Sequence, residues 1–141
     1  HRDFHVSSLM YQNKKIAVID SQDALIGNRA YDLASLIDDV RLKTSNKLKD
    51  KVFKFYINTN KKINVRNFKN DFEILSVLRN LKIIGIFTRL SIRDNKNTYL
   101  KLIPYAWKLI EQRTEQNKKF IELKIILDKY FPKKLRNKHE N

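Results

Sequence analysis

Hydrophobic and polar residues follow two different patterns along this chain of 141 residues. Near its start, two short apolar runs, Leu9-Met10-Tyr11 and Ile16-Ala17-Val18-Ile19, flank the polar connection Gln12-Asn13-Lys14-Lys15. Two such runs around a short polar connection are typical of a β-hairpin. If the runs pair antiparallel, the residues before Leu9 and those after Ile19 emerge at the same end of the hairpin.

From Asp23 onward the apolar residues recur at spacings of three and four, which predicts amphipathic helices. The first of these helices begins near Asn28, and the stretch from Asp71 to Ser91 is apolar on more than one face, as in a helix buried within a lobe. The other segments with this spacing are Leu48–Tyr56, Leu102–Ile110 and Phe120–Phe131. We therefore predict an α+β fold that is mostly α, with one hairpin followed by about five helices.

Composition places the chain among single folded domains. Hydrophobic residues make up 42% of it, enough for a core, and it has 0 cysteines, which excludes disulfides and thiolate metal sites. We find no apolar run of the roughly 20 residues that a membrane helix needs, and no secretory signal pattern. We expect a cytoplasmic, monomeric protein without a membrane partner.

The net charge of +15 changes this picture little, because the lysines are scattered through nearly every segment. The dense basic run 133–138 follows Pro132 and predicts a disordered basic tail over residues 133–141, after a single folded lobe over residues 1–132. Non-specific polyanion binding at low salt is expected. A dedicated nucleic-acid function is the alternative that the charge leaves open, and the scattered distribution argues against it.

Candidate chemistry lies at the open end of the predicted hairpin, where the residues before Leu9 and those after Ile19 emerge together. Asp3 stands in a His-Arg-Asp loop, the polar Ser8 follows five positions later, and Asp20 ends the second apolar run. Phosphoryl transfer needs one carboxylate to orient the accepting hydroxyl and another to hold magnesium. The set resembles the catalytic and metal-binding residues of kinase-like phosphotransferases, and this resemblance implies the first role for Asp3, the second for Asp20, and Ser8 as a further magnesium ligand. A purely structural hairpin beside an acidic loop is the alternative.

Five other residues have both structural and functional interpretations. Arg2 and His5 are interpreted as scaffold that positions the loop, although both remain candidates on the substrate side. Asp23 either approaches the substrate or caps a turn. Asp32 falls in the first turn of a predicted helix, where a carboxylate offsets unpaired backbone N–H groups. Trp107 is interpreted as core, with a sugar-stacking platform as the alternative.

These motifs resemble those of the aminoglycoside phosphotransferase-like kinases. Their signature is His-x-Asp-x-His-x-x-Asn, then Ile-Asp-Phe, then Tyr-Asp-Leu at the start of a helix. The matching positions in this chain are His1, Asp3, His5 and Ser8, then Ile19-Asp20-Ser21, then Tyr31-Asp32-Leu33. The resemblance implies the carboxy-terminal lobe of a protein-kinase-like fold, with ATP as phosphoryl donor and Mg²⁺ as cofactor.

Within that family, the chain is most similar to bacterial kinases that phosphorylate the anomeric hydroxyl of N-acetylmuramate and N-acetylglucosamine in peptidoglycan recycling. The likeness extends to about Trp107, and its more specific runs are Gln22-Asp23-Ala24 and Gly85-Ile86-Phe87. It implies a small-molecule sugar as acceptor. With only 2 glycines, the segment encodes no phosphate-cradling glycine loop. We therefore expect the triphosphate grip in an amino-terminal lobe upstream, and no kinase activity from this segment alone.

Two positions depart from the family pattern: Ser8 replaces the metal-binding asparagine and Ser21 replaces the phenylalanine after the metal aspartate. A serine hydroxyl is a shorter oxygen ligand than an asparagine side chain. The replacements keep two alternatives open. One is a kinase of the same superfamily for another small hydroxyl substrate, such as an aminoglycoside or a choline-like alcohol. The other is a degenerate, non-catalytic binding module.

Overall fold

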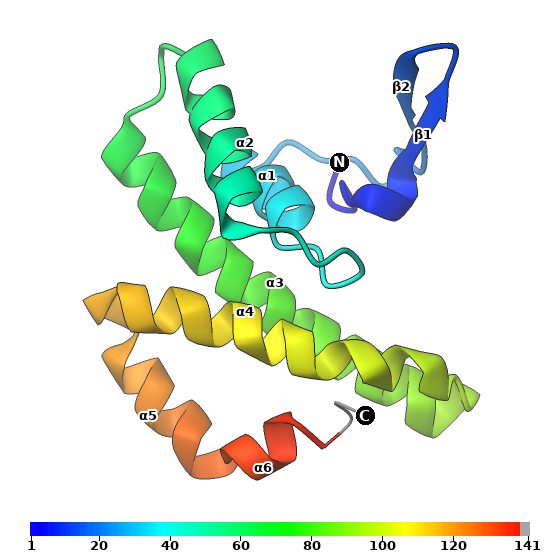
Figure 1. The fold of residues 1–141 in the computed structure, drawn as a ribbon, viewed down its shortest axis with the longest axis vertical. Coiled ribbons are helices and arrows are strands. Elements are labelled where there is room, and N and C mark those ends of the chain that lie inside the picture. The colour runs from blue at the N-terminus through cyan, green and yellow to red at the C-terminus, as the bar shows by residue number, and fades with distance from the viewer. Residues whose placement is uncertain (139–141) are drawn as a thin grey trace. The chain divides into compact units, whose positions relative to one another are not determined.

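The chain is mostly helical, with one antiparallel sheet of two strands among the residues that the structure describes (Figure 1). The structure is a computed structural model, and it describes residues 1–138 apart from the side chain of Gln116. Two compact units, His1–Ser76 and Val77–Asn141, divide the chain, and the long helix α3 (Val65–Asp94) contributes residues to both. No helix in the described part is long and apolar enough to cross a lipid bilayer.

The predicted hairpin is confirmed and opens the first unit. Strands β1 (Leu9–Gln12) and β2 (Lys15–Val18) pair antiparallel, with Leu9 opposite Val18 and Gln12 opposite Lys15. The connection is therefore shorter than predicted and consists of Asn13 and Lys14, whose φ angles are 51° and 59°. Two left-handed residues in a two-residue loop are the signature of a type I′ turn, whose twist matches that of the strands.

Three helices complete the first unit: α1 (Arg29–Ile37), α2 (Asn46–Thr59) and the beginning of α3. Asn28 starts α1 as predicted, because its side-chain oxygen accepts from the backbone N–H of Ala30 at 2.9 Å. Ser45 caps α2 in the same way at Leu48. Helix α3 begins earlier and ends later than the predicted stretch 71–91.

The core of the first unit lies between α1 and the aromatic side chains of α2 and α3. Ala30 and Ala34 are fully buried on α1, and their small side chains let the neighbouring helices approach closely. Phe53 of α2 packs against Phe72 of α3 with ring centroids 5.1 Å apart. This packing fixes α1, and α1 in turn carries the residues that hold the amino-terminal loop.

The second unit consists of the rest of α3, then α4 (Ile103–Gln116), α5 (Ile121–Tyr130) and the short α6 (Lys133–Arg136). Two 3-10 helices, Asn97–Leu102 and Lys118–Phe120, precede α4 and α5. Trp107 of α4 is 4% exposed, which confirms that it is a core residue. Its ring packs against Phe131 with centroids 5.2 Å apart.

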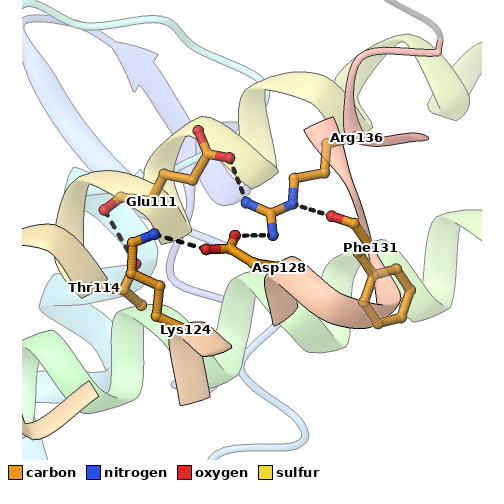
Figure 2. A network of polar contacts seen from close by, with 6 residues as sticks. All are labelled: Glu111, Thr114, Lys124, Asp128, Phe131 and Arg136. Atoms are coloured by element: carbon orange, nitrogen blue, oxygen red, sulfur yellow. Dashed lines mark hydrogen bonds and ion pairs between the residues drawn. The ribbon is translucent and has the colours of Figure 1, made fainter. Parts of the chain in front are cut away.

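Arg136 joins α4, α5 and α6 in one polar cluster, which we call the Arg136 clasp (Figure 2). Its guanidinium donates to Glu111 of α4 and to Asp128 of α5, each at 2.6 Å, and to the carbonyl oxygen of Phe131. The guanidinium carbon also lies 5.0 Å from the centroid of the Trp107 ring. With a side chain only 4% exposed, Arg136 is the buried centre of the cluster.

The clasp makes residues 133–138 differ from the disordered tail that the sequence predicted. The composition of the run 133–138 is typical of a solvated segment, but Arg136 donates to two carboxylates and to the Phe131 carbonyl oxygen. These partners compensate for the burial of its charge. Residues 139–141 of the predicted tail lie outside the described residues. The single lobe over 1–132 stays a prediction.

Candidate active site

The predicted catalytic loop, residues 1–8, is held together by short backbone hydrogen bonds. The N–H of His5 donates to the carbonyl oxygen of Asp3 at 3.0 Å, and the N–H of Ser8 donates to that of His5 at 2.9 Å. The 3-10 helix Val6–Ser8 leads directly into β1. The Asp3 side chain is exposed to solvent, on a loop whose backbone has a defined path.

Ser8 and Asp20 are neighbours across the open end of the hairpin. The N–H of Ile19 donates to the carbonyl oxygen of Ser8 at 3.0 Å, which adds one pair to the ladder and puts Asp20 next along the chain. Their side chains differ in access, because Ser8 is 1% exposed and Asp20 is exposed. The Ser8 hydroxyl lies 3.4 Å from Nδ1 of His5. Of the two predicted metal ligands, Asp20 is thus the accessible one, and Ser8 is buried beside His5.

Asp20 has a left-handed backbone conformation, with φ of 62°. Non-glycine residues adopt this conformation rarely, and where they do the strain is often part of a functional site. The residue before it is tied to the loop, because Nε2 of His1 donates to the carbonyl oxygen of Ile19 at 2.8 Å. His1 thereby connects the loop that carries Asp3 with the end of β2, a contact that the sequence patterns did not reveal.

Asp32 fixes the start of the loop to α1. Its carboxylate lies 2.7 Å from the main-chain nitrogen of His1 and accepts from the N–H of Arg2 at 2.9 Å. Arg2 itself has a positive φ of 71°. Asp32 was predicted to serve the N–H groups of its own helix, but these two contacts serve a loop thirty residues earlier in the sequence.

Asp39 fixes the other end of the loop, and sequence reasoning assigned it no role. Its carboxylate accepts from the N–H of Val6 at 3.0 Å and is 1% exposed. The available signal was the tandem Asp38-Asp39 just after α1, where two carboxylates meet the negative end of the helix dipole. Acidic residues at such a position need donors from elsewhere, and here one donor is the N–H of Val6 in the predicted catalytic loop.

Two of the predicted substrate-side residues, Arg2 and His5, belong to the loop itself, and the third, Asp23, lies after β2. A guanidinium nitrogen of Arg2 donates to the carbonyl oxygen of Asp23 at 3.4 Å, which links the loop to the segment after β2. The Asp23 side chain is exposed. The contacts of Arg2 and His5 agree with scaffold roles, and the catalytic and substrate roles of all these residues stay predictions.

The donor set suits a magnesium ion that is shared with phosphate. Within residues 1–138 no group of three His, Cys, Asp or Glu side chains is placed to bind a metal by itself. Mg²⁺ is commonly held by one or two carboxylates together with substrate phosphates and water. The exposed carboxylate of Asp20 fits this mode, whereas an all-protein metal site does not fit the described residues.

Comparison with known proteins places the first part of the chain in a class of phosphotransferases. The model of the phosphotransferase enzyme family matches residues 1–62, which include the loop, the hairpin, α1 and α2. The resemblance predicted from the sequence motifs is thereby confirmed, and the match covers the whole of the candidate site.

Individual relatives are N-acetylmuramate/N-acetylglucosamine kinases. The chain is 28% identical to that of Caulobacter vibrioides over 137 residues, which cover 94% of this chain and 38% of the relative. It is 36% identical to that of Neisseria meningitidis serogroup B over 114 residues, or 74% of this chain and 33% of the relative. The kinase of Pseudomonas aeruginosa is 28% identical over 129 residues. The chain thus spans little more than a third of the length of these relatives.

Proposed function

We propose that this chain is the catalytic lobe of an ATP-dependent kinase whose acceptor is a sugar hydroxyl. The acceptor we favour is the anomeric hydroxyl of N-acetylmuramate or N-acetylglucosamine. One observation carries the proposal: the loop with Asp3 is tied through His1 to the strand end with the left-handed Asp20, inside the segment that matches the phosphotransferase family. The names of the relatives support the choice of acceptor.

Asp3 acts on the acceptor hydroxyl in this proposal. Its exposed carboxylate orients the hydroxyl and takes its proton as the oxygen attacks the terminal phosphorus of ATP. The new bond joins the sugar oxygen to phosphorus, and the bond from that phosphorus to the bridging oxygen of ADP breaks. Because this chemistry depends mainly on positioning, the backbone anchors at Arg2 and Val6 matter as much as the carboxylate itself.

Asp20 is the proposed magnesium ligand. When bound, the ion neutralises charge on the phosphates. Asp20 offers a hard oxygen donor at the end of β2, and its left-handed backbone redirects the chain immediately after the strand. Ser8 contributes through a water molecule or not at all, since its hydroxyl is buried beside His5.

The test is an assay of the chain at the length of its kinase relatives, with ATP, Mg²⁺ and either sugar. Phosphorus NMR of the product distinguishes an anomeric phosphate from a phosphate on another hydroxyl. Asp3→Asn should lower turnover by roughly 10²-fold, as loss of a positioned general base does, with nucleotide affinity nearly unchanged. Asp50→Asn, at an exposed position of α2, is the matched control and should keep turnover. Equal loss of turnover and nucleotide affinity in Asp3→Asn would argue against the catalytic role.

A non-catalytic binding module is the second candidate, because Ser8 is buried where the family has a metal-binding asparagine. A module of this kind would bind nucleotide without turning it over, and magnesium would not change its affinity. Calorimetric titration with ATP, with and without Mg²⁺, separates the two candidates. A related kinase for another small alcohol would instead turn over with that alcohol and leave both sugars untouched.

A further inference from the structure

Two adjacent aspartates at the end of α1 are both almost fully buried and hold different parts of the first unit. Asp38 and Asp39 are each 1% exposed. A buried carboxylate is costly unless donors satisfy it. The donors that bind these two carboxylates therefore show which segments are attached to the end of α1.

Asp38 holds helices. One of its oxygens accepts from Nζ of Lys49 on α2 at 2.9 Å, and the other from the hydroxyl of Ser76 on α3 at 2.6 Å. Both donors belong to the helical part of the first unit. Asp38 therefore serves the packing of α1, α2 and α3.

Asp39 holds the loop. Its Oδ2 accepts from the N–H of Val6 at 3.0 Å, while Oδ1 accepts from the N–H of Arg41 at 3.0 Å. The Arg41 side chain approaches Oδ1 at 3.3 Å and balances the charge. Val6 is thirty-three positions earlier in the sequence, so this bond is a tertiary constraint on the loop.

Asp32 on α1 and Asp39 just after it are anchors that bracket Asp3. Asp32 binds the N–H of Arg2, directly before Asp3, and Asp39 binds the N–H of Val6, three residues after it. Since the Asp3 carboxylate itself is exposed, the backbone on either side sets its position. Asp32 is part of the Tyr-Asp-Leu motif, whereas Asp39 lies outside the three signature motifs of the family and adds the second fixed point.

We propose that Asp39 is a positioning residue for phosphoryl transfer, which acts on Asp3 through its hydrogen bond to the backbone of Val6. The proposal rests on the proposed kinase function. Without this bond the loop would lose its fixed point at Val6, and Asp3 would sample positions displaced from the acceptor hydroxyl. Because a displacement of about 1 Å can cost on the order of 100-fold in rate, the effect should fall on kcat.

The first experiment compares Asp39→Ala with Asp38→Asn in the chain at the length of its kinase relatives, using ATP, Mg²⁺ and N-acetylglucosamine or N-acetylmuramate. Asp39→Ala should lower kcat roughly tenfold to 100-fold with little change in KM for either substrate. Asp38→Asn, at the equally buried neighbouring position, should lower the melting temperature but keep kcat. If both variants lose kcat equally, or if Asp39→Ala keeps it, the positioning role is wrong.

The second experiment removes the same hydrogen bond by changing its donor, the N–H of Val6. Val6 is the first residue of its 3-10 helix and His5 before it is extended, so the backbone at this position accepts proline. Val6→Pro deletes the donor N–H and should lower kcat as Asp39→Ala does. If both act through one bond, the double variant should be no slower than the slower single variant. Fully multiplicative losses would overturn the proposal.

Hydrogen exchange at the Val6 amide gives a readout that does not depend on activity. Exchange at this amide should become faster in Asp39→Ala and stay slow in Asp38→Asn. If the wild-type chain phosphorylates neither sugar, the proposed kinase function fails, yet this pattern would still support Asp39 as the anchor of the loop. Unchanged exchange at Val6 in Asp39→Ala would refute the anchor itself.

Discussion

Asp20 combines an exposed carboxylate with a backbone conformation that most residues avoid, at φ of 62°. A non-glycine residue held in this region costs about 1 kcal/mol or more. A site selected for stability alone would favour glycine here, since glycine has no Cβ to clash. The aspartate therefore costs local stability relative to glycine, while it provides a carboxylate after β2.

This difference between aspartate and glycine predicts opposite effects of one substitution on stability and on activity. Asp20→Gly should stabilise the fold by up to about 1 kcal/mol and abolish magnesium-dependent turnover. Asp20→Ala should abolish turnover without the gain in stability, because alanine keeps the backbone strain. Thermal melts and magnesium titrations of the two variants, in the chain at the length of its relatives, check both effects. An active Asp20→Ala enzyme would refute the metal assignment.

Ser8→Ala is the matched control in the same titration. Its hydroxyl has one long contact, 3.4 Å to His5, so the loss should cost on the order of 1 kcal/mol or less and keep turnover. Ser8→Asn, which restores the family residue, should lower the magnesium concentration needed for half-maximal rate. If Ser8→Ala abolished turnover, Ser8 would be a direct ligand and not a residue of the scaffold.

At the scale of elements, the sequence predicted those structures that depend on neighbouring residues alone. The hairpin followed from two apolar runs, and α1 from Asn28 and its three- and four-residue spacing. The roles of Asp39 and Arg136 depend on partners thirty-three and twenty-five positions away, and no local pattern encodes those pairings. The turn at Asn13 and Lys14 was also missed in its detail, because neither residue is a glycine.

The Arg136 clasp predicts a large effect from one residue in a short helix. Arg136→Ala removes two ion pairs, a bond to the Phe131 carbonyl and the cover over Trp107, and should destabilise the second unit by about 2 kcal/mol. Lys134→Ala, which removes one exposed charge from the same helix, should have little effect. Thermal melts followed by circular dichroism compare the two. Equal melting temperatures would contradict the clasp.

The clasp also predicts a dependence of stability on pH. The hydrogen bond from Lys124, followed in size by the one from Arg136, lowers the pKa of Asp128 below its usual value of 3.8. A carboxyl whose pKa is lower in the folded state stabilises the fold above its unfolded pKa, and this contribution is lost as the pH falls through the folded value. Melting temperatures should therefore fall as the pH drops below about 4. Asp128→Asn should make this fall shallower; an unchanged slope would contradict the linkage.

At the scale of the whole molecule, the chain of 141 residues would supply only part of the proposed phosphotransfer site. In the proposed enzyme Asp3 would serve the acceptor and Asp20 the metal, but 2 glycines provide no loop to cradle a triphosphate. The chain also spans little more than a third of the length of its kinase relatives. The remaining contacts to ATP in the proposed enzyme would come from outside these residues.

We therefore predict that residues 1–141 alone do not phosphorylate N-acetylglucosamine or N-acetylmuramate. Catalysis of this kind is positioning together with electrostatic stabilisation, and half of the phosphate clamp would be missing. The assay compares the 141-residue chain with the chain at the length of its relatives, at equal concentration with ATP and Mg²⁺. Measurable transfer by the short chain would refute the prediction, and circular dichroism would confirm that the short chain is folded.

Trp107 gives the second unit an optical label that the first unit lacks. It is the only one of its kind in the sequence, and its indole lies beneath Arg136 and beside the Phe131 ring. Fluorescence excited selectively at the indole therefore reports on the surroundings of α4, α5 and α6, whereas the six tyrosines are shared by both units. A shift of emission toward longer wavelength would indicate that Trp107 has become exposed to solvent. The unfolding of the second unit can thus be followed in an unlabelled sample.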